Sequence, residues 1–366
     1  MRLLYVANVR MPTERAHGVQ IIKTCEALVR AGRSVELLVP SRRTPIEADA
    51  FSYYGTKERF PIIKVPVVDT VSWGSVGFVI ESLSFALSAL RYASRDGCIV
   101  YGRDEIILAI VLLCTKRPVV WESHTGAWGL AARYVARHAK RVVVISNGLR
   151  EFYVECGIPE ERIIVAPDAV DLEDFEKTET LEEARGRLGL NGLGKIALYI
   201  GDFGGWKGTD TLFEASNHLS GEVTVVAIGG KTDQLPGFKK KFPKVRFLGP
   251  RPYSELPQNQ AAANVLVLPN TAKNSISAKF TSPLKLFTYM ASGKPIVASD
   301  IPSIREVLPE GGAYWCKPDD AKDLARAIER AAKDPNAHER ASVARHAATR
   351  YTWEARTSLL GQLFVL

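Results

Sequence analysis

The stretch from Phe280 to Asp300 reads FTSPLKLFTYMASGKPIVASD. Ser282 and Pro283 predict a helix start, because a serine hydroxyl can cap free backbone N–H groups and proline presets the backbone for the first turn. Gly293 predicts the end of that helix, since glycine readily adopts the left-handed conformation common there. The apolar run 295–299 then predicts a buried strand. A helix joined by a short turn to a buried strand is the repeating unit of an α/β sheet.

The same alternation of short apolar strands and amphipathic helices runs along the rest of the chain. Strands are predicted at 2–7, 35–39, 98–101, 119–121, 142–145 and 163–166, and again at 196–200, 223–228, 245–248, 265–268 and 296–298. Buried strands that alternate with helices predict parallel, doubly wound sheets. Because the alternation starts twice, we expect an α/β protein with two Rossmann-like domains that face each other across a cleft. Ligands should lie there, beyond the carboxyl ends of the strands.

The domain boundaries follow from composition. A chain of 366 residues is long enough for two cores of ordinary size. Residues 173–194 (EDFEKTETLEEARGRLGLNGLG) are charged and then glycine-rich, which is typical of a linker. We therefore predict a first domain over 1–172 and a second over 195–350.

Composition also limits the class of protein. With 46% hydrophobic and 24% charged residues the chain is globular. Its five cysteines are far apart in sequence and form no Cys-x-x-Cys pair, which favours a reducing cytoplasm over a disulfide framework or a zinc site. The N-terminus MRLLYVANV lacks the architecture of a signal peptide. The apolar region 76–90 contains Glu81 and several serines, so we expect an amphipathic helix and no membrane-spanning helix.

The net charge of +8 is spread along the sequence and favours anionic partners, either phosphates or an acidic membrane surface. Arg42 and Arg43, together with the helix predicted at 76–90, suggest peripheral contact with the inner face of a membrane. A soluble saccharide or another small molecule is the alternative partner. No nucleic-acid partner is expected.

Two loops that join a strand to a helix have the composition of anion sites. The loop 10–20 (RMPTERAHGVQ) places Gly18 near a helix start, where free N–H groups and the helix dipole attract anions. The loop 200–210 (IGDFGGWKGTD) places Gly205 and Lys207 before a helix, and lysine can neutralise a phosphate as a point charge. The second loop fits neither the phosphate-binding GxxxxGK[ST] pattern nor the dinucleotide pattern GxGxxG. A flexible loop and an ordinary surface lysine are the plainer interpretations.

Two further stretches place polar groups at the same edge. His124, in WESHTGAWG (121–129), follows a predicted buried strand, although a single histidine is more often structural than catalytic. The helix start at 282–284 is again a potential anion site. Two helix starts and a lysine that converge on one cleft would suit a pyrophosphate.

In these stretches the chain resembles the retaining glycosyltransferases of family 4, which have the GT-B fold, and in particular their SPLK-type subgroup. The similarity lies in HGVQIIKTCEALVRAG, VVWESH, VVVISNGLREFYVECGIPEERIIVAPDAVDLEDF, YIGDFGGWKG and SPLKLFTYMASGKPIVASDIPSIREVL, in the family's order. It also implies that 351–366 is a terminal helix that crosses back to the first domain. Such enzymes move a sugar from a nucleotide sugar to an acceptor hydroxyl with retained configuration.

The resemblance implies roles for individual residues. Gly18 would donate its N–H to the diphosphate, Lys207 would hold the same group, and the amides of Ser282, Pro283 and Leu284 would complete the cradle. His124 would contact the donor sugar. The leaving diphosphate would take the acceptor's proton, so that no dedicated nucleophile, cofactor or metal is expected; the sequence contains no Asp-x-Asp after a strand.

The departures from the family are equally specific. Two glutamates eight residues apart are usual, and their positions hold Phe280 and Thr288 here. Thr288 therefore stands where a carboxylate would contact the ribose. Asp202 stands where an arginine is frequent, and Asp168 where asparagine is frequent, with a loop-capping carboxylate as the plainer role of Asp168.

Two functions therefore remain open at the level of sequence. The first is an active transferase for a glycan, lipid-linked or small-molecule acceptor. The second is a catalytically weakened partner of an active transferase that retains the fold. An NAD-dependent oxidoreductase is disfavoured because the glycine fingerprint is missing. The base, the sugar and the acceptor are not evident from the sequence.

Overall fold

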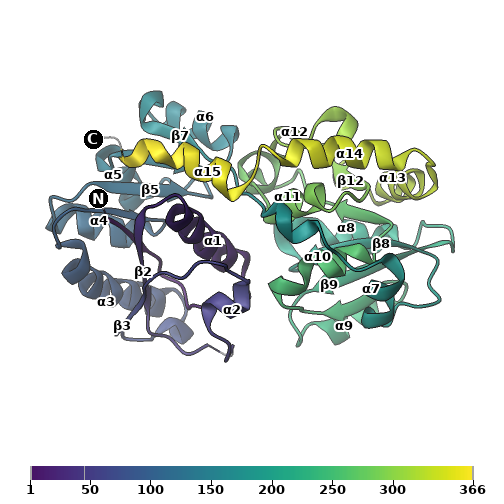
Figure 1. Ribbon diagram of the computed structural model, residues 1–366, viewed down its shortest axis with the longest axis horizontal. Helices are drawn as coiled ribbons and strands as arrows, with labels where there is room; N and C mark the ends of the chain where they lie inside the picture. Colours follow the sequence, from purple (N-terminus) through teal and green to yellow (C-terminus); the bar gives the residue numbers. More distant parts are fainter. Residues whose placement is uncertain (1, 45, 365–366) are drawn as a thin grey trace. The chain divides into compact units, whose positions relative to one another are not determined.

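The computed structural model describes residues 2–44 and 46–364. The chain forms two compact units, of which the first comprises Met1–Pro167 with Trp353–Leu366 and the second Asp168–Thr352. Each unit is built on one parallel sheet with helices packed around it (Figure 1). The prediction of two doubly wound α/β sheets is confirmed.

The first unit has a seven-stranded sheet in the order β3-β2-β1-β4-β5-β6-β7, and every pair of neighbouring strands is parallel. The sequence predicted each strand except β3, a four-residue strand at one edge of the sheet. The strands are β1 Arg2–Val6, β2 Ser34–Pro40, β3 Ile62–Val65, β4 Cys98–Gly102, β5 Val119–Ser123, β6 Arg141–Val144 and β7 Ile163–Val165. The helices are α1 Ala16–Arg30, α2 Ala50–Tyr54, α3 Ser75–Ala93, α4 Glu105–Cys114, α5 Leu130–His138, α6 Asn147–Glu155 and α15 Trp353–Leu360, with short turns η1 Val71–Trp73, η2 Glu160–Arg162 and η8 Gly361–Phe364.

The second unit has a six-stranded sheet in the order β10-β9-β8-β11-β12-β13, again parallel throughout. The strands are β8 Lys195–Gly201, β9 Val223–Gly229, β10 Arg246–Gly249, β11 Val265–Leu268, β12 Ile296–Ser299 and β13 Tyr314–Cys316, of which only the last was not predicted. The helices are α7 Leu181–Leu188, α8 Thr209–Ala215, α9 Leu235–Lys241, α10 Leu256–Ala261, α11 Leu284–Ala291, α12 Pro302–Arg305, α13 Ala321–Lys333 and α14 Ala337–Ala348. Shorter turns are η3 Leu172–Phe175, η4 Gly205–Lys207, η5 Tyr253–Glu255, η6 Ile276–Phe280 and η7 Glu310–Gly312.

Both sheets reverse their strand order at one point. In the first unit the reversal lies between β1 and β4, and in the second between β8 and β11. Where the order reverses, the loops that follow the two central strands diverge to opposite faces and leave room for a ligand. The loops after β1, β4, β8 and β11 are therefore the positions where the fold offers sites.

The segment 173–194 is not a linker in the structure. Thr180 caps α7 with a reciprocal capping box to Glu183, and Ala184 and Leu188 are buried in the core of the second unit. The charged residues occupy the exposed face of this short amphipathic helix, which explains why their composition was misleading. The second unit therefore begins at Asp168, earlier than the sequence predicted.

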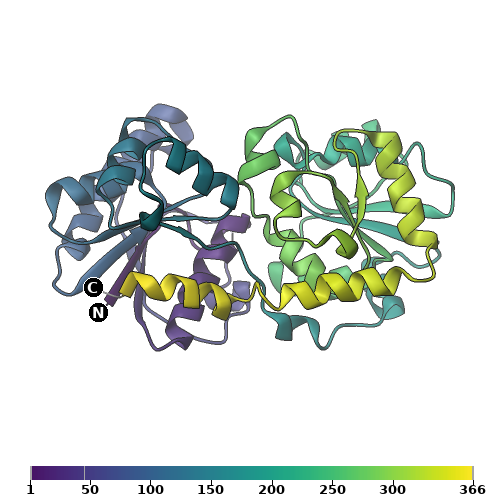
Figure 2. The ribbon, with the colours of Figure 1, turned by 90° about the horizontal axis from the view of Figure 1, so that it is seen from above.

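The C-terminal helix α15 packs on the first unit. Trp353 and Leu360 are fully buried, and the yellow helix lies beside the purple α1 in Figure 2. Tyr351 still belongs to the second unit, where its carbonyl accepts a hydrogen bond from the Val170 N–H. The helix thus begins at Trp353 instead of residue 351, and residues 365 and 366 of the predicted segment lie outside the described residues.

Helix α3 was expected to be amphipathic and not to span a membrane. In the described part of the chain, this helix alone is long and apolar enough to cross a bilayer by length and composition. However, Glu81, Ser82 and Phe85 are buried within the first unit, and Glu81 accepts hydrogen bonds from Arg42 and Asn8. Because one face holds a paired carboxylate, the helix packs as part of the domain.

Candidate functional site

The turn after β8 presents Lys207 at the carboxyl edge of the second sheet. Gly204, Gly205 and Gly208 all have φ between 60° and 88°, a region that glycine tolerates better than other residues. The Lys207 ammonium lies 3.0 Å from a carboxylate oxygen of Asp202 and is about one quarter exposed. The turn thus holds a cation at the point where the strand order reverses.

Close packing fixes this turn against the next central strand. A Cβ atom on Gly208 would lie 1.8 Å from the carbonyl oxygen of Pro269, which follows β11. The Gly204 N–H donates to the Thr209 hydroxyl at 2.7 Å. The backbone around Lys207 is therefore held in place before any ligand binds.

A second lysine, which the sequence analysis did not single out, lies near the same loop. Lys285 is on α11, and its Nζ donates to the Tyr199 hydroxyl at 2.6 Å. That hydroxyl in turn donates to the Asp202 carbonyl at 2.9 Å. Burial and the positive charge of Lys207 hold the pKa of Lys285 well below its usual range. The second unit therefore brings two amino groups close to Asp202. In the sequence, Lys285 is the lysine of the stretch SPLK, which was the one local signal for it.

The start of α11 differs from the prediction. The helix begins at Leu284, and the Ser282 hydroxyl does not cap it; that oxygen accepts a hydrogen bond from the Asp168 N–H at 3.0 Å. Pro283 has no N–H to donate, so only Leu284 of the predicted trio begins the helix. Asp168 and Ser282, both buried, join the first segment of the unit to this helix start.

Thr288 is placed differently from the ribose contact that the resemblance implied. It is 1% exposed, its hydroxyl accepts from Gln260 Nε2 at 3.0 Å, and it donates to the Lys285 carbonyl at 3.1 Å. Both partners lie within the second unit, so the hydroxyl serves packing between α10 and α11. The sequence motif could not reveal this contact, because Gln260 lies 28 positions before Thr288 and outside the motif.

We expect Thr288→Val to lower the free energy of unfolding by about 1–2 kcal/mol, because Gln260 loses a buried hydrogen-bond partner. Nucleotide affinity should change little. Denaturant titration and calorimetric binding of the same variant test both statements. A large loss of affinity without loss of stability would return Thr288 to the binding site.

In the first unit, the backbone N–H of Gly18, which was predicted to bind an anion, is hydrogen-bonded within the protein. Helix α1 begins at Ala16, and the Gly18 N–H donates to the Arg15 carbonyl at 2.9 Å. A Cβ atom here would lie 2.2 Å from the Tyr54 hydroxyl oxygen, which bonds both the N–H and the carbonyl of Thr13. Glycine is thus required for close packing, and the expected free N–H of Gly18 is engaged.

His124 follows β5 and is held by the buried carboxylate of Glu122. Its Nε2 lies 2.6 Å from Glu122 Oε1, and its side chain is about one fifth exposed. Burial, with the nearby positive charge of Arg103, lowers the pKa of His124 to about 4. At neutral pH the imidazole is uncharged, and the Nε2 proton is directed to Glu122. Nδ1 is then left as a hydrogen-bond acceptor.

Glu122 organises the residues around it. Gln20 donates to Oε1 at 2.7 Å and Arg356 at 2.8 Å, with Arg103 at 3.4 Å, while the Tyr101 hydroxyl donates to Oε2. Burial alone would raise the pKa of this carboxyl, but Arg356 and Arg103 hold it well below its usual range. Burial and the positive charge of Arg103 also lower the pKa of His17, on α1, to about 4.

Sequence reasoning missed this cluster because its members lie far apart in the chain. Glu122 lies two residues before His124, near the end of β5, and this spacing was the one local signal. Nothing in the sequence indicated the distant Arg356.

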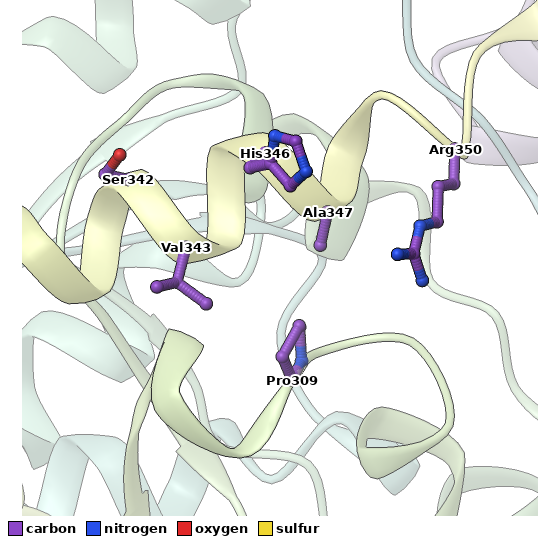
Figure 3. Close-up of a pocket in the computed structure, with 6 residues that line it drawn as sticks. All are labelled: Pro309, Ser342, Val343, His346, Ala347 and Arg350. Atoms are coloured by element: carbon purple, nitrogen blue, oxygen red, sulfur yellow. The ribbon is translucent and has the colours of Figure 1, made fainter.

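The first unit therefore places Glu122 near the end of β5 and His124 directly after it, and the second places two lysines after β8 and at the start of α11. A separate hollow of about 360 Å³ is lined by Pro309 and by α14 (Figure 3). It lies on the segment that leads into β13, away from the carboxyl ends of the strands. Among the described residues, there is no group of three or more His, Cys, Asp or Glu side chains that could hold a metal ion.

Comparison of the sequence with known protein families shows which family the chain matches. Residues 17–174 match the family described as Glycosyltransferase Family 4, and residues 194–334 match Glycosyl transferases group 1. D-inositol 3-phosphate glycosyltransferase from Streptomyces bingchenggensis is 26% identical over 227 residues, which are 57% of this chain and 48% of that protein. The match thus spans about half the length of this curated relative.

Solved structures show the same fold over the whole chain. HepE from Anabaena in complex with UDP and glucose has a TM-score of 0.76 at 19% identity, and covers 100% of this chain and 99% of that one. Sucrose-phosphate synthase from Thermosynechococcus elongatus has a TM-score of 0.80 at 20% identity, and covers 100% and 98%. Since the two matched families together cover most of the sequence, this chain belongs to the group 1, family 4 glycosyltransferases and has the GT-B fold.

Proposed function

We propose that this protein is a retaining glycosyltransferase that transfers a sugar from a nucleotide sugar to an acceptor hydroxyl without a metal ion. The observation that supports it most is the pair of amino groups, Lys207 and Lys285, beside Asp202 at the point where the second sheet reverses its strand order. The Lys207 ammonium, with the Lys285 amino group close by as a hydrogen-bonding group, suits the negative charge of a diphosphate better than a neutral ligand.

The proposed reaction assigns the second unit to the leaving group. The bond between the anomeric carbon and the diphosphate oxygen breaks, and the charge that develops on that oxygen is stabilised by Lys207 and the first amides of α11. The diphosphate oxygen takes the proton of the acceptor hydroxyl, whose oxygen bonds to the anomeric carbon on the face that the diphosphate leaves. No protein nucleophile takes part in this balance.

The first unit supplies His124. Its neutral ring offers Nδ1 as an acceptor for a sugar hydroxyl, because Glu122 holds the Nε2 proton. Its backbone carbonyl would face the positive charge that develops on the sugar. His17, next to Gly18, also has a pKa lowered to about 4, because burial and Arg103 oppose its positive charge.

A thermal-shift panel of UDP-, GDP-, ADP- and dTDP-sugars tests the donor class, because a ligand that binds only the native state raises the melting temperature. We expect one nucleotide family to stabilise the protein and its sugar to be transferred to an added acceptor. Stabilisation without transfer or donor hydrolysis favours the catalytically weakened partner, an alternative prompted by the missing carboxylate at Thr288. No stabilisation by any member of the panel contradicts the proposal.

Metal independence is a separate prediction. Lysine and backbone N–H groups already stabilise the leaving diphosphate in this scheme, so we expect transfer to persist in excess EDTA. The measurement is the initial rate with and without chelator. A rate abolished by EDTA and restored by Mg²⁺ or Mn²⁺ contradicts it.

We also propose a cytoplasmic protein whose first unit contacts the inner face of a membrane through α3. Trp73, Val76 and Leu87 are each about 70% exposed, and Ile80 and Leu83 continue the stripe at helical spacing. Arg91, which is exposed, follows this apolar stripe near the carboxyl end of α3. Arg42, which the sequence suggested for lipid contact, is instead bound to buried Glu81. An apolar stripe with a basic end fits an anionic lipid surface.

Leu87→Glu should reduce sedimentation with phosphatidylglycerol vesicles about tenfold, because it removes the burial of one leucine and adds a repelled charge. Val343→Glu is the matched control, since it makes the same kind of change at an exposed apolar residue of α14 in the second unit. Equal sedimentation of the wild type and Leu87→Glu would mean that the acceptor is reached in solution.

A further inference from the structure

The buried carboxylate that holds His124 is also bound by a residue from the far end of the chain. Among the described residues, Glu122 on β5 is the one hydrogen-bond partner of the His124 ring, and Arg356, 234 residues further on, donates to the same Oε1 atom at 2.8 Å. The Arg356 side chain is 2% exposed and that of Glu122 is not exposed. A buried carboxylate keeps its charge only when opposite charges and hydrogen-bond donors surround it.

Arg356 reaches this position because α15 is firmly packed on the first unit. Trp353 and Leu360 are fully buried on either side of it in the helix, and Arg30 of α1 pairs with Glu354 at 2.9 Å. The helix follows the entire second unit in sequence, yet its arginine completes a group formed by β4, β5 and α1. Without the C-terminal segment, the Glu122 carboxylate would therefore lose one of its hydrogen-bond donors.

We propose that Arg356 is a positioning residue for sugar transfer. It fixes the charge and direction of the Glu122 carboxylate, so that Glu122 holds the Nε2 proton of His124 and leaves Nδ1 as the acceptor for the donor sugar. This inference rests on the proposed function for the role of His124, but the link between Arg356 and His124 can be measured without any substrate.

The electrostatic surroundings determine the sign of the effect. Arg103 and Arg356 oppose protonation of His124, and Glu122 favours it. His17 contributes a further repulsive interaction if charged, whereas the buried Tyr5, Tyr101 and Cys25 have pKa values raised by burial and remain neutral. Removal of Arg356 takes away one cation, so the pKa of His124 should rise.

The experiment is the NMR titration of ¹³C,¹⁵N-histidine-labelled protein, with the His124 signal assigned from a His124→Gln variant. In the wild type, His124 should stay neutral from pH 8 to about pH 5, consistent with a pKa of about 4. In Arg356→Met we expect the midpoint to rise by about one unit, the scale of losing one nearby charge. Arg356→Lys keeps the charge and should keep the midpoint.

Transfer kinetics complete the test. Arg356→Met should lower kcat more than it raises the nucleotide Kd, because the nucleotide phosphates lie with the second unit's lysines. Glu354→Ala, which removes only the exposed ion pair of the same helix, is the control for helix docking and should retain both the titration and the rate. An unchanged His124 midpoint in folded Arg356→Met overturns the inference, as does an equal loss in Glu354→Ala.

If Arg356→Met does not fold, Arg356→Lys decides the matter. The proposal then requires a lower kcat with an unchanged midpoint, because a lysine cannot reproduce the planar fork of the guanidinium. A wild-type rate in that variant contradicts the proposal. Failure of the donor panel would remove the role of His124 in transfer, while the titration would still report whether Arg356 controls its protonation.

Discussion

Lys207→Ala should lower the rate of sugar transfer by about a hundredfold, the scale of losing one preorganised charge at a developing anion. The turn that holds Lys207 is fixed by Gly208 against Pro269 and by Asp202, so the ammonium is in position before the donor arrives. Because the same charge contacts the diphosphate before and during the reaction, the nucleotide Kd should rise as well. Steady-state kinetics and calorimetric titration with the preferred donor measure both effects.

Lys240→Ala is the matched control, because Lys240 is an exposed lysine near the end of α9, away from the carboxyl ends of the strands. It should retain the wild-type rate. Unchanged turnover and unchanged affinity in Lys207→Ala would remove this turn from the site. A Lys207→Ala protein whose residual activity disappears in Lys207→Ala/Lys285→Ala would show that the Lys285 amino group also contributes to transfer.

Glu122→Gln should affect both stability and transfer. The substitution leaves Arg356 and Arg103 without their buried countercharge, and breaking a buried pair of this kind costs about 3–5 kcal/mol. We expect a lower free energy of unfolding and a loss of transfer of at least about a hundredfold, because His124 loses the carboxylate that orients its ring. Denaturant unfolding and kinetics at a temperature where the variant is folded give the two values.

Glu36→Gln provides the comparison, since Glu36 pairs with Arg2 at 3.0 Å in a position that is about one fifth exposed. That variant should lose less of the free energy of unfolding than Glu122→Gln, because its pair is not fully buried, and it should retain transfer. The acidic side of the wild-type stability curve gives a further check. Since the pKa of Glu122 is held low in the folded state, its contribution is present above the unfolded pKa and is lost as the pH falls through the folded pKa. A folded Glu122→Gln protein with wild-type transfer would separate His124 from the reaction.

The sequence predicted most elements of both sheets because buried parallel strands are short and apolar, and each is followed by a helix with one apolar face. Edge strands β3 and β13 were missed, since neither has a long apolar run. The segment 173–194 was misjudged because the charges on α7 outnumber the few apolar residues that place it in the core.

The residues of the candidate site also differ in how far the sequence could predict them. Gly205 and Lys207 could be singled out because a glycine-rich turn after a strand leaves a local pattern, and their contact with a ligand stays a prediction. Thr288 and Gly18 were assigned ligand contacts by resemblance, whereas in the structure Gln260 and the Arg15 carbonyl engage them. Whether a hydroxyl or an N–H is available to a ligand depends on neighbours from other elements, which a motif does not contain.

By itself, the sequence of this protein determined the two parallel sheets, their helices and the positions of the loops at the carboxyl ends of the strands, because these follow from periodicities of two to four residues along the chain. Only the tertiary structure decided that Lys285 lies near Lys207, that α7 belongs to the second unit, and that Arg356 shares the Glu122 carboxylate with His124. These contacts join residues separated by tens to hundreds of positions. Hydrogen bonds and charge interactions act over a few ångströms in space, so their partners are fixed by the packing of the elements and not by their order in the chain.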